Sequence, residues 1–299
     1  MADIESIAYA VDPPTPTLPA LRRERLKNTI LGMPQLGVNG LSENWLLKEA
    51  GSMHWSLICH EVGQDASEIF DGFGNRLYAS FIASELCSTA LADFEEDERI
   101  ELRTTIEQLS RLRFASTTKV RSLANPYRTA TLSLSSIFMR RKHTNDNHSL
   151  ASAPPCLGGD TGGEDFSSTG QLASFIERNN KLRDSAAGFL GRMQSSAARS
   201  IDYEICPLTD FNGAGLLYFA NFQSIIDRCE WSLFPEWRGQ PMATRRRSIS
   251  YLGNVNADDS LRLCFLPDAV GQANRAHDCL VFRKSDSKLV AVSSLERKG

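Results

Sequence analysis

The chain has 299 residues, of which 41% are hydrophobic and 23% charged, and its formal net charge at pH 7 is -3. This composition is typical of a globular protein with room for two medium domains. It argues against nucleic acid as the main partner, because no long basic stripe occurs. The seven scattered cysteines include no Cys-x-x-Cys pair, which favours reduced thiols over a disulfide framework or a zinc site.

Residues 1–22 are predicted to form a flexible tail, because four closely spaced prolines exclude a helix there. The segment lacks the basic and then apolar order of a signal peptide. No apolar run in the chain approaches the ~18 residues of a membrane span. We therefore expect a soluble, cytoplasmic protein with no membrane partner.

The first half, residues 23–142, contains a helix predicted over 42–57. It follows Pro34 and the pair Asn39-Gly40. Apolar residues spaced by four, three and four positions indicate one buried helical face. An alternating strand follows over 77–81, and an acidic turn at 97–98 precedes another alternating strand. The four residues of the helical face are Leu46, Ala50, Met53 and Leu57.

Residues 143–170 are predicted to be a linker, because they hold many glycines and prolines and few large apolar side chains. An amphipathic connecting helix is predicted over 171–195, packed across both halves. The second half, residues 196–299, repeats the first. Pro207 and Asn212-Gly213 occur in the same register, and a second helix is predicted over 216–233. Its apolar face is Phe222, Ile226, Cys229 and Leu233.

Each half thus reads as a strand, a turn, one long helix and several antiparallel strands. A single apolar helix must bury its face, and a curved antiparallel sheet wrapped around it is the economical solution. The sequence therefore predicts an α+β double hot-dog fold. The alternative is two unrelated α+β halves that match by chance.

The strongest local motif is Asp-Phe-Asn-Gly-Ala-Gly, residues 210–215, just before the second long helix. Unpaired backbone N–H groups at a helix start can hold a thioester oxygen as negative charge develops on it. Asp210 could orient water or act as a base beside that oxygen. The simpler interpretation is that Asp210 or Asn212 caps the helix.

This motif, followed by Tyr-Phe-Ala-Asn-Phe at 218–222, resembles the start of hot-dog proteins of the 4-hydroxybenzoyl-CoA thioesterase type. The resemblance implies that Asp210 is the catalytic carboxylate. The first half departs from this pattern, because Gly37 stands in the register of Asp210. Only one such carboxylate is therefore expected in the chain.

A resemblance to the LnmK-type double hot-dog biosynthetic proteins covers most of the chain. It rests on Gly-Met at 32–33, on Gly-Leu-Ser-Glu-Asn-Trp-Leu-Leu-Lys-Glu at 40–49, and on segments 51–55, 74–81 and 210–231. The resemblance implies an acyltransferase and decarboxylase of polyketide biosynthesis, which takes methylmalonyl-CoA and leaves propionyl groups on an acyl carrier protein. Tyr78 matches the tyrosine that accepts the acyl group. From the strand pattern alone, Tyr78 could equally pack against the other half.

The leading hypothesis is that a malonyl-type thioester binds between the halves, with backbone N–H groups near Gly40 or Gly213 holding its oxygen. The expected partners are acyl-CoA and an acyl carrier protein, and the chain could form a homodimer. No metal or redox cofactor is expected. Three alternatives stay open: a thioesterase that uses Asp210, a dehydratase or hydratase, and a non-catalytic module that binds carrier proteins. The predicted substrate-binding residues are Asn39, Gly40, Leu41, Ser42, Asn212, Gly213 and Gly215.

Two further features are expected to be peripheral. His54 is predicted to cap its helix or to lie at the surface. The basic runs at 140–142 and 245–247 are predicted to be solvated faces, or to meet CoA phosphates or an acidic carrier protein.

Overall fold

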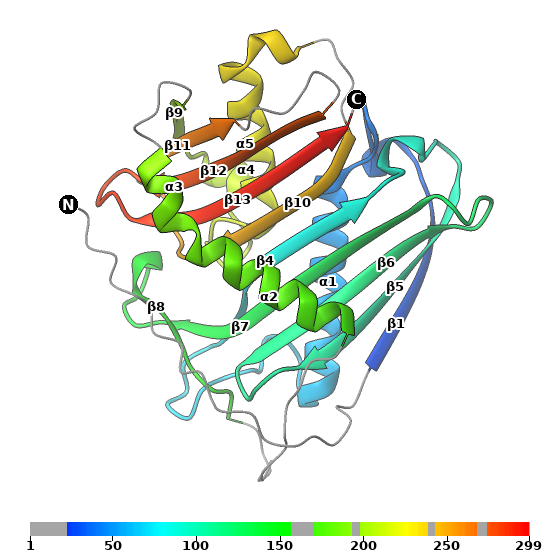
Figure 1. Ribbon diagram of the computed structural model, residues 1–299. Helices are drawn as coiled ribbons and strands as arrows, with labels where there is room; N and C mark the ends of the chain where they lie inside the picture. The colour runs from blue at the N-terminus through cyan, green and yellow to red at the C-terminus, as the bar shows by residue number, and fades with distance from the viewer. Residues whose placement is uncertain (1–22, 157–169, 193–197, 239–242, 268–273, 299) are drawn as a thin grey trace.

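The computed structural model describes residues 23–156, 170–192, 198–238, 243–267 and 274–298 (Figure 1). The expected tail and residues 157–169 of the expected linker lie outside the described residues. Within these ranges, eleven strands form one antiparallel sheet. Across the sheet they follow the order β1 (Arg23–Ile30), β5 (Arg99–Gln108), β6 (Arg113–Ser122), β7 (Thr129–Arg141), β4 (Tyr78–Ser88), β10 (Ala243–Tyr251), β13 (Leu289–Lys298), β12 (Asn274–Arg283), β11 (Ser260–Pro267) and β9 (Arg199–Glu204), with β8 (Leu150–Ser152) paired to β7.

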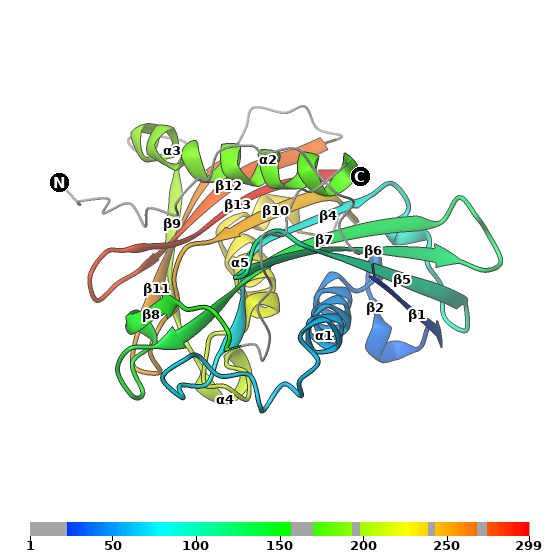
Figure 2. The same ribbon diagram turned by 90° about the horizontal axis from the view of Figure 1, so that it is seen from below.

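The two halves have the same strand order and meet where β4 pairs with β10. In this pairing Leu86 lies opposite Arg247, and Ser84 lies opposite Ile249. The long helices α1 (Glu43–Val62) and α5 (Phe219–Leu233) lie side by side on the concave face of the sheet (Figure 2). The predicted α+β double hot-dog fold, with one long helix against each half of the sheet, is confirmed.

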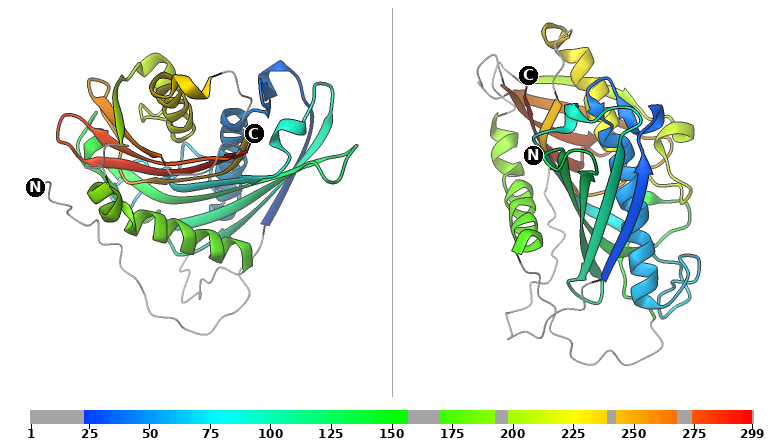
Figure 3. Two further views of the ribbon diagram at one scale, coloured as in Figure 1. Left: turned by 45° about the horizontal axis from the view of Figure 1, so that its top comes forward. Right: turned by 90° about the vertical axis from the view of Figure 1, so that its right-hand side faces the viewer.

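The opposite face of the sheet carries α2 (Gly170–Asp184) and α3 (Ala186–Arg192) (Figure 3). We expected one connecting helix over 171–195. The structure instead has two helices separated at Ser185, whose hydroxyl donates to the carbonyl of Leu182 at 2.7 Å. The pair crosses strands of both halves, as expected for a connector.

Helix α1 is longer than the predicted 42–57. Ser42 caps its start by accepting from the N–H of Trp45 at 3.3 Å, and Gly63 ends it with a φ of 66°. Helix α5 begins later than predicted, because residues 211–217 close a turn instead of a first helical turn. In that turn the N–H of Asn212 donates to the carbonyl of Leu216 at 2.9 Å.

The predicted helical faces pack into a core shared by both halves, except for Leu57, which lies in a separate cluster of the first half. All eight residues of the two faces are buried except Leu233, which is half-buried. Where the helices meet, the Asn44 amide donates to the carbonyl of Ala220 and to the hydroxyl of Ser224, both at 2.9 Å. Each large buried apolar side chain in such a core contributes about 1.5–3 kcal/mol.

The first part of the expected linker, residues 143–156, is folded. It contains η3 (Asn147–Ser149) and β8, and Asn147 is only 5% exposed. Among the described residues, no helix is long and apolar enough to span a membrane. The remaining short elements are η1 (Met33–Gln35), β2 (Leu36–Gly37), β3 (Gly40–Leu41), η2 (Leu91–Asp93), α4 (Pro207–Asp210) and η4 (Pro235–Trp237).

Candidate active site

A cavity of about 570 Å³ lies where the start of α5 meets the middle of α1 and the first residues of β4. Its volume is in the range of small-molecule binding pockets. Gly51 lets α1 pack directly against the ring of Phe219 beside the cavity, because a Cβ atom at this position would lie 2.8 Å from that ring. Aromatic rings supply much of the apolar wall of this first cavity: Trp55, Phe81, Phe219, Phe222 and Tyr251.

Two phenols of the first cavity, those of Tyr218 and Tyr251, are not ionised. Burial raises the pKa of Tyr218 and of Tyr251. The hydroxyl of Tyr251 is also hydrogen-bonded to that of Ser84 at 2.9 Å. Both phenols therefore stay neutral at physiological pH.

The turn before α5 and the first residue of α5 leave backbone donors free beside the first cavity. The side-chain oxygen of Asn212 accepts from the N–H groups of Ala214 and Leu216, at 3.0 and 3.1 Å, which fixes the turn. Within the part of the chain that the structure describes, the N–H groups of Gly213 and Phe219 have no acceptor, and both residues line the cavity. Such groups can hold an oxygen on which negative charge develops.

Tyr78 reaches the same cavity from the first half. The guanidinium carbons of Arg76 and Arg141 lie 5.4 and 5.5 Å from the centre of its ring. Arg141 in turn donates to Asn147 Oδ1 at 2.8 Å and to the carbonyl of Ala214 at 2.5 Å. The structure thus brings Tyr78 and the turn at 212–215 into one site, and no described residue is hydrogen-bonded to the Tyr78 hydroxyl.

Asn147 joins the two halves beside Tyr78. Its side-chain amide donates to the carbonyls of Gly215 and Val255, at 2.7 and 2.8 Å. Sequence reasoning missed this residue, because it lies in the segment read as a linker. Only its long-range partners identify it, and the sequence does not reveal them.

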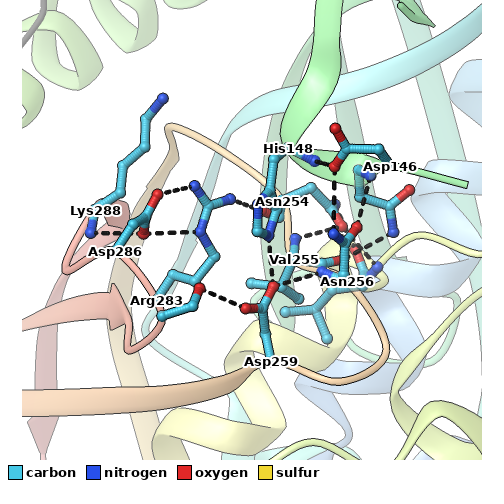
Figure 4. A network of polar contacts seen from close by, with 12 residues as sticks. Asp146, His148, Asn254, Val255, Asn256, Asp259, Arg283, Asp286 and Lys288 are labelled. Carbon is cyan, nitrogen blue, oxygen red and sulfur yellow. Dashed lines mark hydrogen bonds and ion pairs between the residues drawn. The ribbon is translucent and has the colours of Figure 1, made fainter. Parts of the chain in front are cut away.

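A histidine–carboxylate pair also borders the first cavity (Figure 4). His148 lines the cavity, and its Nε2 lies 2.6 Å from Oδ2 of Asp259. Burial raises the pKa of Asp259, but hydrogen bonds from Ser285, His148 and the N–H of Asn256 outweigh burial and lower it below the ordinary value. Asp259 is therefore ionised at neutral pH. This pair was not found from the sequence either.

Asp210 does not line the first cavity. It is 4% exposed, and its Oδ2 accepts from the hydroxyl of Tyr203 at 3.1 Å and from the N–H of Cys206 at 2.9 Å. Its Oδ1 accepts from the hydroxyl of Thr209 at 3.3 Å. These contacts fix the short helix α4. Helix α5 begins after Tyr218 with no side-chain cap, so neither Asp210 nor Asn212 caps the long helix as the simpler interpretation held. The geometry gives Asp210 a structural role at α4, outside the first cavity.

The predicted substrate-binding residues divide between two cavities. Asn212 and Gly213 line the first cavity, whereas Gly215 is not among its lining residues and accepts from Asn147 through its carbonyl. A second cavity of about 460 Å³ lies at the start of α1. Its lining includes the other four predicted residues, Asn39, Gly40, Leu41 and Ser42.

The second cavity repeats the first in position but not in chemistry. In the register that aligns the two long helices, Glu43 stands where Phe219 does, and Asp227 stands where Gly51 does. Arg247 pairs with both carboxylates, at 2.7 and 2.6 Å. Burial raises the pKa of Glu43, although Arg247 opposes this. Burial also acts to raise the pKa of Asp227, but its arginine partners outweigh burial and lower it.

The prediction for His54 is wrong, and the prediction of a solvated face at 245–247 is wrong at Arg247 alone, since Arg245 and Arg246 are exposed. His54 lies within α1 and is fully buried, and its ring nitrogens are hydrogen-bonded to the hydroxyls of Ser116 and Ser136, at 2.7 and 2.8 Å. The face of α1 that carries it packs against the sheet, which leaves no room for a surface role. Arg247 is 2% exposed rather than solvated, because the carboxylates of both long helices surround it.

Comparison of the sequence with protein-family models and with curated proteins finds no match. Among the solved structures that are similar over nearly their whole length are two acyl-ACP thioesterases. A 12:0-ACP thioesterase from Umbellularia californica has a TM-score of 0.58 and 11% identity, with 92% of this chain and 97% of that chain covered. An acyl-ACP thioesterase from Bacteroides thetaiotaomicron has a TM-score of 0.59 and 12% identity, with 92% and 98% covered. The chain has the double hot-dog fold. At these identities the likeness establishes the fold alone, and function must be argued from the site.

Proposed function

We propose that this protein cleaves an acyl-CoA or acyl-carrier-protein thioester in the first cavity, with water as the acceptor. The observation that carries the proposal is the pairing of an aromatic wall with two free N–H groups, that of Gly213 in the turn before α5 and that of Phe219 at the start of α5. Attack on a thioester places negative charge on the carbonyl oxygen, and preorganised N–H donors stabilise that charge. The fold shared with two acyl-ACP thioesterases supports hydrolysis over the decarboxylation and transfer that the family resemblance implied.

Two cationic side chains beside the first cavity favour a thioester substrate that carries phosphate. Arg76 and Lys288 line the cavity, and neither side chain has an ion-pair partner among the described residues. Both CoA and the phosphopantetheine arm of a carrier protein bear phosphate, which cations of this kind bind.

The placement of Tyr78 favours a second candidate, the acyl transfer and decarboxylation implied by the family resemblance. The Tyr78 hydroxyl would attack the thioester carbonyl, the C–S bond would break, and the thiol would leave with the proton. The acyl group would then pass from the tyrosine ester to the thiol of a carrier protein. With a malonyl-type substrate, loss of CO2 would give an enolate whose oxygen the same N–H groups would hold.

Product analysis separates the two candidates. The purified chain is incubated with acetyl-, longer acyl-, malonyl- and methylmalonyl-CoA, with and without a carrier protein, and the products are followed by mass spectrometry. Hydrolysis predicts free acid and CoA in equal amounts, and it predicts that Tyr78→Phe keeps turnover. Transfer predicts an acylated carrier that Tyr78→Phe abolishes, while Tyr127→Phe, at an 86% exposed site, serves as the control. A wild-type protein that leaves every thioester intact would contradict both candidates.

A further inference from the structure

His148 is held rigidly at the border between the two halves. It lies on η3, and its backbone N–H donates to Asp146 Oδ1 at 2.9 Å. The Asn256 amide of the second half donates to the same oxygen at 3.2 Å. Figure 4 shows how these contacts place the ring of His148 against Asp259.

Asp259 fixes which nitrogen of the His148 ring carries the proton. The carboxylate is 8% exposed and already accepts from the N–H of Asn256 at 2.7 Å and from the Ser285 hydroxyl at 2.6 Å. Because Asp259 is ionised, Nε2–H of His148 donates to it at 2.6 Å. Nδ1 is then the basic nitrogen, and none of the described residues is hydrogen-bonded to it.

The charges around His148 come from three elements. Asp146 belongs to its own loop, and Asp259 lies just before β11. Asp286 belongs to the turn between β12 and β13, where Arg283 pairs with it and also donates to a backbone carbonyl of the 254–256 segment. Asp259 is the carboxylate that contacts the imidazole ring itself.

We propose that His148 is the general base of the hydrolysis and that Asp259 is its positioning residue, an inference that rests on the proposed function. Nδ1 of His148 takes one proton from water while the water oxygen bonds to the thioester carbonyl carbon. The C–S bond then breaks, and its electron pair leaves with sulfur. The imidazolium returns its proton to the thiolate, which gives the free acid and the thiol. Asp259 holds the ring in place and stabilises the imidazolium between these steps.

Four variants test the proposal through kcat/KM for acyl-CoA hydrolysis between pH 5 and 9, with thermal stability measured on the same preparations. His148→Ala should lower kcat/KM by about 100-fold or more. It should also remove the fall in kcat/KM toward acid pH. Added imidazole should restore part of the lost rate. His148→Gln keeps a donor for Asp259 but has no base, so it should be equally inactive while folding normally. Asp259→Asn should reverse the tautomer, place the proton on Nδ1 and lower the rate. His143→Ala, in the same loop but outside the lining of the cavity, should match the wild type.

The outcomes distinguish this inference from the function on which it rests. If the wild type hydrolyses thioesters and stable His148→Ala and His148→Gln do so at the same rate, His148 is not the base and the proposed function stands. If the variants lose activity only to the extent that they lose thermal stability, and imidazole restores none of it, then His148 and Asp259 serve only to hold the two halves together. If the wild type hydrolyses no acyl-CoA and no acyl-carrier thioester, the proposed function fails and the inference fails with it.

Discussion

Acid should destabilise this protein through His54, a buried residue that does not itself line the first cavity. His54 is 0% exposed, and burial lowers its pKa from the ordinary 6.5 to about 3. In the unfolded chain the same imidazole binds a proton below pH 6.5, whereas in the folded chain it stays neutral down to about pH 3. The unfolded state therefore binds more protons in this window, so stability falls as the pH falls from 6.5 towards 3.

The size of the effect follows from the shift in pKa. Each pH unit within the window changes the free energy of unfolding by about 1.4 kcal/mol. Between pH 8 and pH 5 the wild type should lose about 2 kcal/mol through His54 alone. This loss is a large share of the ~5–15 kcal/mol that separates folded and unfolded states in typical domains.

Urea unfolding at pH 8 and pH 5 measures this loss. His54→Gln is the matched variant, because its amide can bond to Ser116 or Ser136 but does not titrate. It should be less stable than the wild type at pH 8 and should lose about 2 kcal/mol less between the two pH values. Equal losses in wild type and variant would refute the reasoning, since they would mean that His54 accepts its proton in the folded state.

Three further substitutions test the structural account. Gly40→Ala should cost about 3 kcal/mol in urea unfolding, because Gly40 has a φ of +81° and a Cβ there would lie 2.2 Å from the carbonyl oxygen of Leu91; Gly72→Ala, with no neighbour within 4 Å, is its control. Arg247→Met should cost about 3 kcal/mol, because the buried carboxylate of Glu43 loses its partner and the half-buried Asp227 keeps only Arg297. A loss below about 1 kcal/mol would show that Glu43 is protonated or hydrated. Asp210→Asn should cost about 1 kcal/mol and leave thioester turnover within twofold of wild type, whereas a fall of about 100-fold would return that carboxylate to the catalytic role.

The fold was readable from the sequence because the two long helices carry apolar faces at helical spacing. These faces are buried in the structure, and their repetition revealed the two halves. His54 lies on the same face as Leu46 and Ala50, eight and four residues before it, so the spacing itself could have shown that it is buried. The capping rule for exposed helix ends led to the wrong expectation.

The site was less readable, because it depends on contacts between residues far apart in the chain. Asn147 and His148 lie in a polar segment with no periodicity, and their partners Val255 and Asp259 lie more than a hundred residues later. The motif that begins at Asp210 was visible in the sequence. The sequence alone could not show that the Asp210 carboxylate accepts a hydrogen bond from the N–H of Cys206. Nor could it show that charged side chains of an ion cluster line one of the two similar cavities.

Whether the N–H groups of Gly213 and Phe219 hold a thioester oxygen can be seen in a crystal structure with a ketone analogue of acyl-CoA, in which a methylene group separates sulfur from the carbonyl. We expect the analogue in the first cavity, with its ketone oxygen about 2.7–3.1 Å from the backbone nitrogen of Gly213 or Phe219. We also expect the acyl chain against the aromatic wall and the phosphates near Arg76 or Lys288. An analogue bound in the second cavity, or bound in the first with its ketone oxygen away from both nitrogens, would show that the proposed site is wrong.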